Sequence, residues 1–233
     1  MDCGGWCGGC RPASLLYLVH IETVEDNHWE RLPKSCADYQ KKGKRTDGEY
    51  LLYPPILNSV EVRIYCHNMN TTMPKEFVTL KYKNVGKHPN LEDVDCSGNP
   101  MPSKSWSWYT GETEFFKLGV NIQSMMVRET DFTFARHYGE HVVGFGEARD
   151  SYTKHYNQKR NKCGPVGTFH IDMRGTGLKV DDDLEWMAEG QFAYGEWTRD
   201  HGNATVDILA GGYAGGLKPI EPILLMHNPN DIY

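Results

Sequence analysis

The feature that most constrains the fold is an alternation of apolar and polar residues that recurs in short stretches along the chain. Apolar residues stand at every second position in residues 60–66, 116–122 and 167–173. Because successive side chains of a β-strand point to opposite faces, this pattern predicts strands with one buried face. Many of the 24 glycines and 12 prolines lie between such stretches, where they supply turns. The sequence therefore predicts a mainly β fold of antiparallel, sandwich-like sheets with a few short helices.

Residues 35–82 read as one compact module. Ser35, followed by Asp38 three residues later, is the signature of a helix N-terminus. The strands of the module are expected at residues 49–53, 60–66 and 77–82. Cys36 and Cys66 bracket the first hairpin, and a helix flanking that hairpin places them close together. We therefore expect a disulfide between Cys36 and Cys66 that staples the helix to the second strand.

Composition and charge exclude several classes of function. A chain of 233 residues with 39% hydrophobic and 12% aromatic residues is globular rather than disordered. The net charge of −6 argues against nucleic acid as a partner. We expect no membrane span, since no apolar run approaches the required length. Asn70 and Asn203 each begin a glycosylation sequon, and together with the bracketed cysteines they predict an extracellular protein, although no signal peptide is visible.

The N-terminal residues repeat a pattern found near the end of the chain. Residues 1–12 align with residues 208–219 at a constant offset, with four glycines, an aromatic residue, a basic residue and a proline in common. We therefore expect residues 1–12 to be the tail motif of a preceding copy of the same domain. The other segments are then a linker at 13–32, the β domain at 33–219 and a tail, linker or frayed end at 220–233. We expect Cys3, Cys7 and Cys10 to form a disulfide knot, because an iron–sulfur cluster with this spacing needs a reducing compartment.

One motif raises the question of zinc chemistry. Residues 137–141 read His-Tyr-Gly-Glu-His, which fits the H-x-x-E-H pattern of a class of zinc proteases. Such a site holds zinc between two histidines on one helical face, while the glutamate deprotonates a bound water. Here residues 132–136 and 142–145 alternate as strands, which favours a hairpin turn at 137–141. A zinc site at His137, Glu140 and His141 remains the alternative.

Two further stretches have both a structural and a binding interpretation. Asp181, Asp182 and Asp183 offer oxygen ligands for calcium, but they lack the spacing of a known calcium loop. Their position just before residues 184–187 favours acids at the N-terminus of a helix. Residues 85–107 read as a loop, and Trp106 at its end and Trp108 just beyond it either stack on sugars or line a strand face.

Two families resemble parts of this sequence. The blocks S-C-A-D, D-G-E-Y-L-L-Y-P and V-R-I-Y-C-x-N-M within residues 35–70 resemble the opening of fibrinogen-related domains. The blocks P-K-E-F-V-T-L at 74–80, F-K-L-x-V-N-I-x-S-M at 116–125 and G-T-G-L at 175–178 are similar to the GON domain. That family closes on C-G-G-[YW]-C-G-x-C-x-P, which residues 3–12 match intact and residues 210–219 match without cysteines. The likeness to the GON domain covers about residues 33–219, whereas the fibrinogen-like one stops near residue 70.

The resemblance to the GON domain implies the C-terminal ancillary domain of ADAMTS-type secreted zinc metalloproteases. It implies an extracellular, non-catalytic domain that binds a matrix or cell-surface protein, with glycans as further candidate partners. The implied activity of the parent protein is zinc metalloendopeptidase, so zinc belongs to the protease and no cofactor is expected here. A fibrinogen-like glycan-binding lectin and a cryptic zinc enzyme at His137, Glu140 and His141 are the alternative functions.

The sequence departs from the family pattern at several expected cysteines. Ser151 stands where a further cysteine is expected, so Cys163 lacks its usual neighbour, and Cys96 is its candidate partner. Ala210, Ala214 and Leu217 replace the three cysteines of the closing element. Either the N-terminal cysteines supply replacements, or this copy relies on its core.

Overall fold

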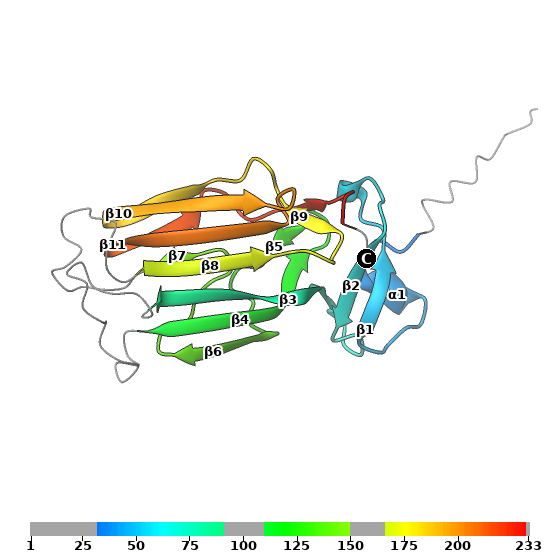
Figure 1. Ribbon diagram of the computed structural model, residues 1–233. Helices are drawn as coiled ribbons and strands as arrows, with labels where there is room; N and C mark the ends of the chain where they lie inside the picture. Colours follow the sequence, from blue (N-terminus) through cyan, green and yellow to red (C-terminus); the bar gives the residue numbers. More distant parts are fainter. Residues whose placement is uncertain (1–31, 91–109, 150–165, 232–233) are drawn as a thin grey trace, which may run out of the picture. The chain divides into compact units, whose positions relative to one another are not determined.

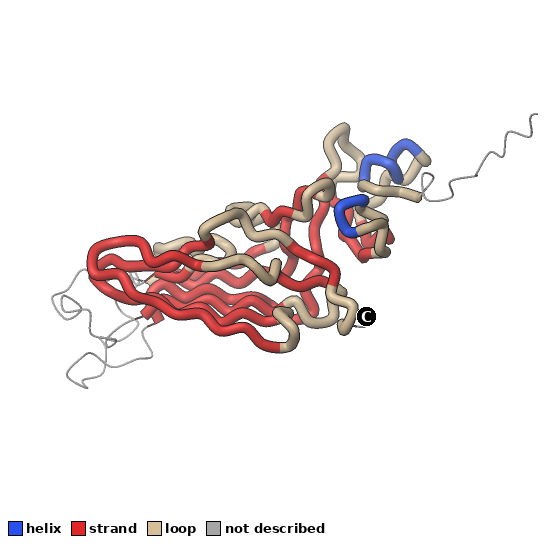
Figure 2. The backbone as a smooth tube through the Cα atoms, turned by 90° about the horizontal axis from the view of Figure 1, so that it is seen from above, coloured by secondary structure: helices blue, strands red, loops and turns tan. Residues whose placement is uncertain are grey.

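The computed structural model describes residues 32–90, 110–149 and 166–231 of the chain. Leu32–Tyr233 form one compact unit. Its helices and strands, in chain order, are α1 (Cys36–Lys41), β1 (Gly48–Leu52), the 3-10 helix η2 (Pro55–Leu57), β2 (Val62–His67), β3 (Lys75–Asn90), β4 (Gly111–Asn121), β5 (Met126–Val127), β6 (Ala135–Gly139), β7 (Ala148–Arg149), β8 (Val166–Asp172), β9 (Leu178–Val180), β10 (Trp186–Asp200), β11 (Thr205–Pro219) and β12 (Leu225–His227). Figure 2 shows how little of the described chain is helical. No helix in these ranges is long and apolar enough to cross a bilayer.

Antiparallel pairing joins ten of the strands into one sheet. Its main path runs β1-β2-β3-β8-β11-β10, while β4 pairs with β3, β5 and β6, and β7 pairs with β11. In Figure 1 the strands β6, β4, β3, β8, β11 and β10 lie side by side. The remaining strands, β9 and β12, form a separate two-stranded sheet. The prediction of a mainly β, antiparallel fold with few helices is confirmed.

Strand β10 bends back on itself. Trp186 is the first residue of the strand and Trp197 lies near its end. The centroids of their two rings are only 6.0 Å apart. Eleven residue steps along a straight strand would separate them by about 36 Å. The ladder between β10 and β11 shifts register at Glu189/Gln191 and Gln191/Tyr194, and Gly190 between these shifts has a φ of 114°. Such bulges bend a strand, so the hairpin of β10 and β11 folds one part of the sheet over another.

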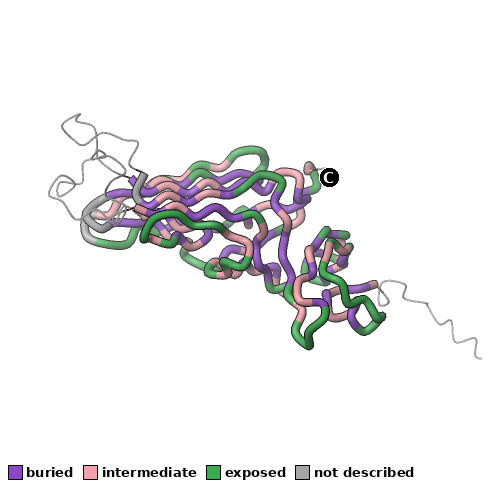
Figure 3. Tube along the Cα trace, turned by 90° about the horizontal axis from the view of Figure 1, so that it is seen from below, coloured by how far each residue is buried: buried purple, intermediate pink, exposed green. Residues whose placement is uncertain are grey.

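The space between these layers is filled by aromatic and aliphatic side chains. Phe145 packs edge-to-face on both Phe115 and Phe169, with ring centroids 5.4 and 5.2 Å away. All three phenylalanines are at most 1% exposed. Figure 3 shows buried residues alternating with more exposed ones along the strands. Strands such as β2 therefore present one face to the core and the other to solvent, as the alternating sequence pattern predicts.

The module at residues 35–82 is stapled as expected. Ser35 caps α1, its side-chain oxygen accepting a hydrogen bond from the backbone N–H of Asp38. A disulfide joins Cys36 to Cys66, with Cα atoms 5.5 Å apart, so this predicted bond is present. The Cys36 N–H also donates to the buried carboxylate of Glu76 on β3 at 3.2 Å. The helix is thus tied both to its own hairpin and to the main sheet.

Strand β3 is longer than predicted. The sequence places a strand at 77–82 and a loop from residue 85, but β3 continues to Asn90. The inward positions of this continuation hold Gly86 and His88, so the apolar half of the alternation is missing from the sequence. A Cβ at Gly86 would lie 2.6 Å from the Phe169 ring, which shows that the strand needs a glycine where the aromatic core approaches it.

The hairpin predicted at residues 132–145 is wrong. Strand β6 begins at Ala135 and includes His137, Tyr138 and Gly139, and residues 142–145 form no strand. Val143 instead donates its N–H to the buried Thr113 hydroxyl at 2.9 Å, and Phe145 donates to the Glu129 carbonyl at 2.9 Å. The alternation at 142–145 therefore reflects two side chains that enter the core from an irregular segment.

The expected tail from residue 220 is also wrong as far as Asp231. Leu225–His227 form β12, which pairs with β9, and Ile223 and Leu225 are almost fully buried. The Asp231 carboxylate accepts hydrogen bonds from the backbone N–H groups of Gly175, Thr176 and Gly177 at 2.7–3.2 Å. Two prolines made this segment look like a linker, but its alternate apolar residues belong to the core.

Candidate functional site: a groove on the sheet

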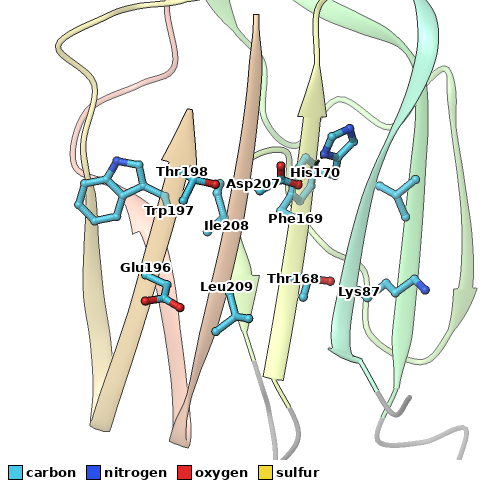
Figure 4. Close-up of a pocket in the computed structure, with 11 residues that line it drawn as sticks. Lys87, Thr168, Phe169, His170, Glu196, Trp197, Thr198, Asp207, Ile208 and Leu209 are labelled. Atoms are coloured by element: carbon cyan, nitrogen blue, oxygen red, sulfur yellow. Dashed lines mark hydrogen bonds and ion pairs between the residues drawn. The ribbon is translucent and has the colours of Figure 1, made fainter. Parts of the chain in front are cut away.

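A groove crosses four strands of the main sheet on the face opposite the phenylalanine core. Eight of its side chains form two cross-strand rows, with one residue each from β3, β8, β11 and β10. The rows are Lys87, Thr168, Leu209 and Glu196, and Val85, His170, Asp207 and Thr198. The groove has a volume of about 450 Å³ and is also lined by Phe169, Trp197 and Ile208. Figure 4 shows the lining residues, and we call this site the sheet groove.

Strand alternation places these side chains on the same face. On β8, Phe169 and Ile171 are buried. Their neighbours Thr168 and His170 therefore point to the opposite face, which is the groove. The same alternation operates on β11, where Val206 and Ile208 are in the core. The antiparallel registers then bring residues from four strands into line, although residues of one row are up to 122 positions apart in the sequence.

A histidine–aspartate pair lies at the centre of the sheet groove. The Nδ1 atom of His170 is 2.7 Å from Oδ1 of Asp207, so Nδ1 donates and Nε2 is left for other contacts. Nε2 is 4.0 Å from Oδ2 of Asp172. Burial of Asp172 acts to raise its pKa, but the hydrogen bonds from Arg174 outweigh that effect and lower the pKa. Two carboxylates therefore surround an imidazole that remains partly open to solvent.

The composition of the sheet groove is that of a recognition surface. It offers an ammonium group at Lys87, carboxylates at Glu196 and Asp207, and hydroxyls at Thr168 and Thr198 beside apolar lining. In the described part of the chain, His170 makes no hydrogen bond to a Ser, Thr or Cys side chain, the contact that activates a nucleophile. The arrangement can bind a partner through complementary hydrogen bonds and charges.

The sequence pattern does not single out these residues. His170 falls inside a correctly predicted strand, where it reads as an ordinary polar position. Lys87 falls in the stretch predicted to be a loop, and Asp207 and Glu196 belong to strands without a clean alternation. Only the strand registers unite them, and a single sequence carries little information on register.

The H-x-x-E-H motif does not form the helix that its zinc chemistry requires. His137 lies in β6 opposite Thr113, while Glu140 and His141 follow the strand and donate their N–H groups to the Thr110 carbonyl. The ring of His141 stacks on the buried ring of His88, with centroids 5.0 Å apart. Over residues 32–90, 110–149 and 166–231, no three His, Cys, Asp or Glu side chains gather closely enough to hold a metal ion.

The interpretation of residues 181–183 as helix-capping acids is wrong. They form a turn that leads directly into β10, since pairing with β11 makes the following residues a strand. Arg199 organises this turn by donating to the carbonyls of Asp181, at 2.8 Å, and Leu184. Hydrogen bonds from Lys179 and Asn203 lower the pKa of Asp182.

Both sequon asparagines lie in turns. Asn70 is exposed in the turn between β2 and β3. Asn203 lies in the turn between β10 and β11 with a φ of 65°, and its amide donates to Oδ1 of Asp182 at 2.7 Å. Glycosylation at either residue stays a prediction. Cys3, Cys7, Cys10, Cys96, Cys163, Trp106 and Trp108 lie outside the described residues.

Two comparisons relate the chain to known proteins, and one does not. The model of the GON domain matches residues 33–226. The chain is 31% identical to "A disintegrin and metalloproteinase with thrombospondin motifs gon-1" of Caenorhabditis elegans, over 81% of this chain and 9% of that protein. It is 27% identical to the human "A disintegrin and metalloproteinase with thrombospondin motifs 20", over 79% of this chain and 10% of that protein. No solved structure matches.

The residues matched by the family model correspond closely to the described helices and strands. The match runs from the start of the stapled module into β12, so it includes both the sheet groove and the C-terminal strand. It also covers residues 35–70, where the sequence resembles fibrinogen-related domains. The chain spans about a tenth of the length of the curated relatives it matches. This chain belongs to the GON domain family.

Proposed function

We propose that this chain carries a non-catalytic ancillary domain that acts outside the cell by binding a matrix or cell-surface protein. Through that contact it positions the metalloproteinase to which a domain of this family is joined. The observation that carries the proposal is the sheet groove, a surface of charged and hydroxyl side chains beside a larger apolar lining, built from four strands within the GON-family match. The groove's mixed charges and hydroxyls suit a folded protein partner, since the polar parts of such interfaces pair in this way.

Three features support an extracellular location. The Cys36–Cys66 disulfide is of a kind that persists in oxidising compartments. Asn70 and Asn203 begin sequons, and the Asn70 sequon is fully exposed. The relatives named above are disintegrins and metalloproteinases with thrombospondin motifs. None of these features identifies the partner, so the partner has to be found by binding.

The test is binding of the full chain, secreted from cultured cells, to extracellular matrix proteins and to a glycan array, each with and without a calcium chelator. We expect saturable binding to a matrix protein that is unchanged by the chelator. Glycan binding that the chelator abolishes would contradict the proposal and favour the lectin alternative. Stoichiometric zinc in protein purified without chelators, released by His141→Ala, would contradict it in favour of the zinc enzyme.

A further inference from the structure

Four cations stand together at the end of α1 and in the loop that leads to β1. Lys41, Lys42, Lys44 and Arg45 occupy five consecutive positions in a chain whose net charge is −6. All four residues are exposed, as is Gly43 between them. We call residues 41–45 the basic loop. Runs of Lys and Arg of this length are typical of sites for polyanions.

The carboxylates nearest in sequence to Lys44 and Arg45 are occupied by other groups. Asp38 accepts a hydrogen bond from the Lys34 N–H at 3.0 Å and pairs with Lys41 at 3.0 Å. Asp47 accepts from the backbone N–H groups of Asn68 and Met69 at 3.1 and 2.7 Å. Among the described residues, the side chains of Lys44 and Arg45 make no hydrogen bond or ion pair. These two cations are therefore available to a ligand.

Other cations of the fold contrast with this loop. Lys83 pairs with Glu114, Lys117 lies 3.5 Å from Glu49, and Lys218 lies 2.7 Å from Glu189. A neighbouring carboxylate compensates each of these positive charges. Within the basic loop, Lys44 and Arg45 thus carry positive charge that no carboxylate of the described residues pairs with, in a chain whose net charge is −6.

The backbone of the basic loop is held in place before any ligand arrives. Gly43, with a φ of 86°, closes the helix by donating its N–H to the Gln40 carbonyl at 2.9 Å, and the Lys44 N–H donates to Tyr39 at 3.0 Å. The Tyr50 hydroxyl donates to the Thr46 carbonyl at 2.7 Å. The Cys36–Cys66 disulfide fixes α1 itself. A loop held in this way loses little conformational entropy on binding.

We infer that the basic loop is a binding site for a sulfated polysaccharide. Closely spaced sulfate groups match four cations within five residues, and the exposed loop can be reached by a linear polymer. A membrane surface fits less well, because the loop has no apolar side chain to insert. Nucleic acid fits less well, because the loop has no aromatic side chains on which bases stack. This site is separate from the sheet groove, so it adds a second ligand to the proposed function and does not depend on it.

The test uses heparin as the probe and the full chain as the protein. We expect Lys42→Gln, Lys44→Gln and Arg45→Gln together to weaken heparin binding by roughly tenfold to a hundredfold, since each exposed ion pair contributes modestly. The dependence of affinity on salt should also become shallower by roughly two charges. Circular dichroism and an intact Cys36–Cys66 bond establish that the variant is folded.

Two control proteins keep the inference falsifiable. The charge-matched variant Lys75→Gln, Arg136→Gln and Lys218→Gln removes three cations outside the loop and should keep most of the affinity. The charge-preserving variant Lys42→Arg, Lys44→Arg and Arg45→Lys should bind like the wild type. Equal loss in the two glutamine triples would overturn the inference, since it would mean that only net charge matters.

Two further arms define the ligand and separate this site from the sheet groove. Desulfated heparin and polyglutamate should bind at least about tenfold more weakly than heparin; equal binding would overturn the assignment to a sulfated polymer. The groove variant Glu196→Gln and Asp207→Asn should keep full heparin affinity. Loss of heparin binding in that variant would place the site on the groove and overturn the inference.

Discussion

Gly86 and His88 occupy the two inward positions of β3 that face the end of the core. Gly86 leaves room for the Phe169 ring and the Val143 side chain, both of which would lie 2.6 Å from an added Cβ. His88 is 7% exposed and stacks on His141. Neither residue is apolar and bulky, which explains why alternation in the sequence does not reveal this part of the strand. Their identities are set by neighbours from β8 and the 142–145 segment.

His88 makes the stability of the fold depend on pH. Burial lowers its pKa from 6.5 to about 4, and the nearby His141 and Arg149 act in the same direction. Because the folded-state pKa lies below the unfolded one, the stabilisation is complete above about pH 6.5 and is lost as the pH falls towards 4. Between pH 7 and pH 5 this group alone should cost about 2 kcal/mol. Urea unfolding at the two pH values measures this loss.

The matched comparison is His88→Gln, which keeps a polar side chain but removes the titrating group. Its free energy of unfolding should fall by about 2 kcal/mol less than that of the wild type between pH 7 and pH 5. The same fall in both proteins would contradict a buried, neutral His88.

At the scale of elements, the glycine-rich end of β11 shows how one sequence motif serves the fold. The motif could be aligned with residues 3–12, but its role as a bent strand could not be predicted. A Cβ at Gly215 would lie 2.4 Å from the Gly211 carbonyl oxygen, so the bend requires glycine. Ala210 and Leu217, which replace family cysteines, are 0% and 2% exposed. At these two positions the chain contributes to its core where the family pattern expects cysteine.

The stapled module depends on its disulfide. Cys36→Ala and Cys66→Ala together should lower the free energy of unfolding by about 3–4 kcal/mol, because the bond closes a loop with a sequence separation of 30 residues. Both cysteines are changed so that neither is left to pair with another thiol. Urea unfolding measures the loss, and thiol labelling of the wild type should leave both cysteines unmodified. Labelling of both in secreted, folded protein would refute the bond.

The C-terminal segment depends on Asp231. Its carboxylate accepts N–H groups of three successive residues, so Asp231→Ala leaves these donors without their partner and should destabilise the protein by about 1–3 kcal/mol. Asp231→Asn retains one carbonyl oxygen and should lose less. Hydrogen exchange at the N–H groups of Leu225 and Asn228, which donate to the carbonyls of Met125 and Gly177 at 3.0 and 2.9 Å, reports whether this segment opens. Unchanged exchange and stability in Asp231→Ala would show that the contact does not hold the segment.

At the scale of the whole molecule, local patterns proved far more predictable than long-range ones. The alternating stretches at 60–66, 116–122 and 167–173 and the Ser35 cap follow from neighbouring residues, the Cys36–Cys66 bond follows from one short module, and all are present. The sheet order and the folding-over of β10 and β11 depend on contacts between distant segments. The site belongs to this second class, because His170 and Asp207 meet only through the register of β8 and β11. The residues of the groove can therefore be identified from the structure but not from the sequence alone.

The sheet groove is the central claim at this scale, and a pair of charge-matched variants tests it. The groove variant is Glu196→Gln with Asp207→Asn, and its control is Glu185→Gln with Glu221→Gln, which removes the same charge from exposed residues outside the groove. The most direct measurement is the affinity of each full chain for the matrix protein to which the wild type binds. We predict at least about a tenfold loss for the groove variant and wild-type affinity for the control. Equal affinity of both variants and the wild type would contradict the account.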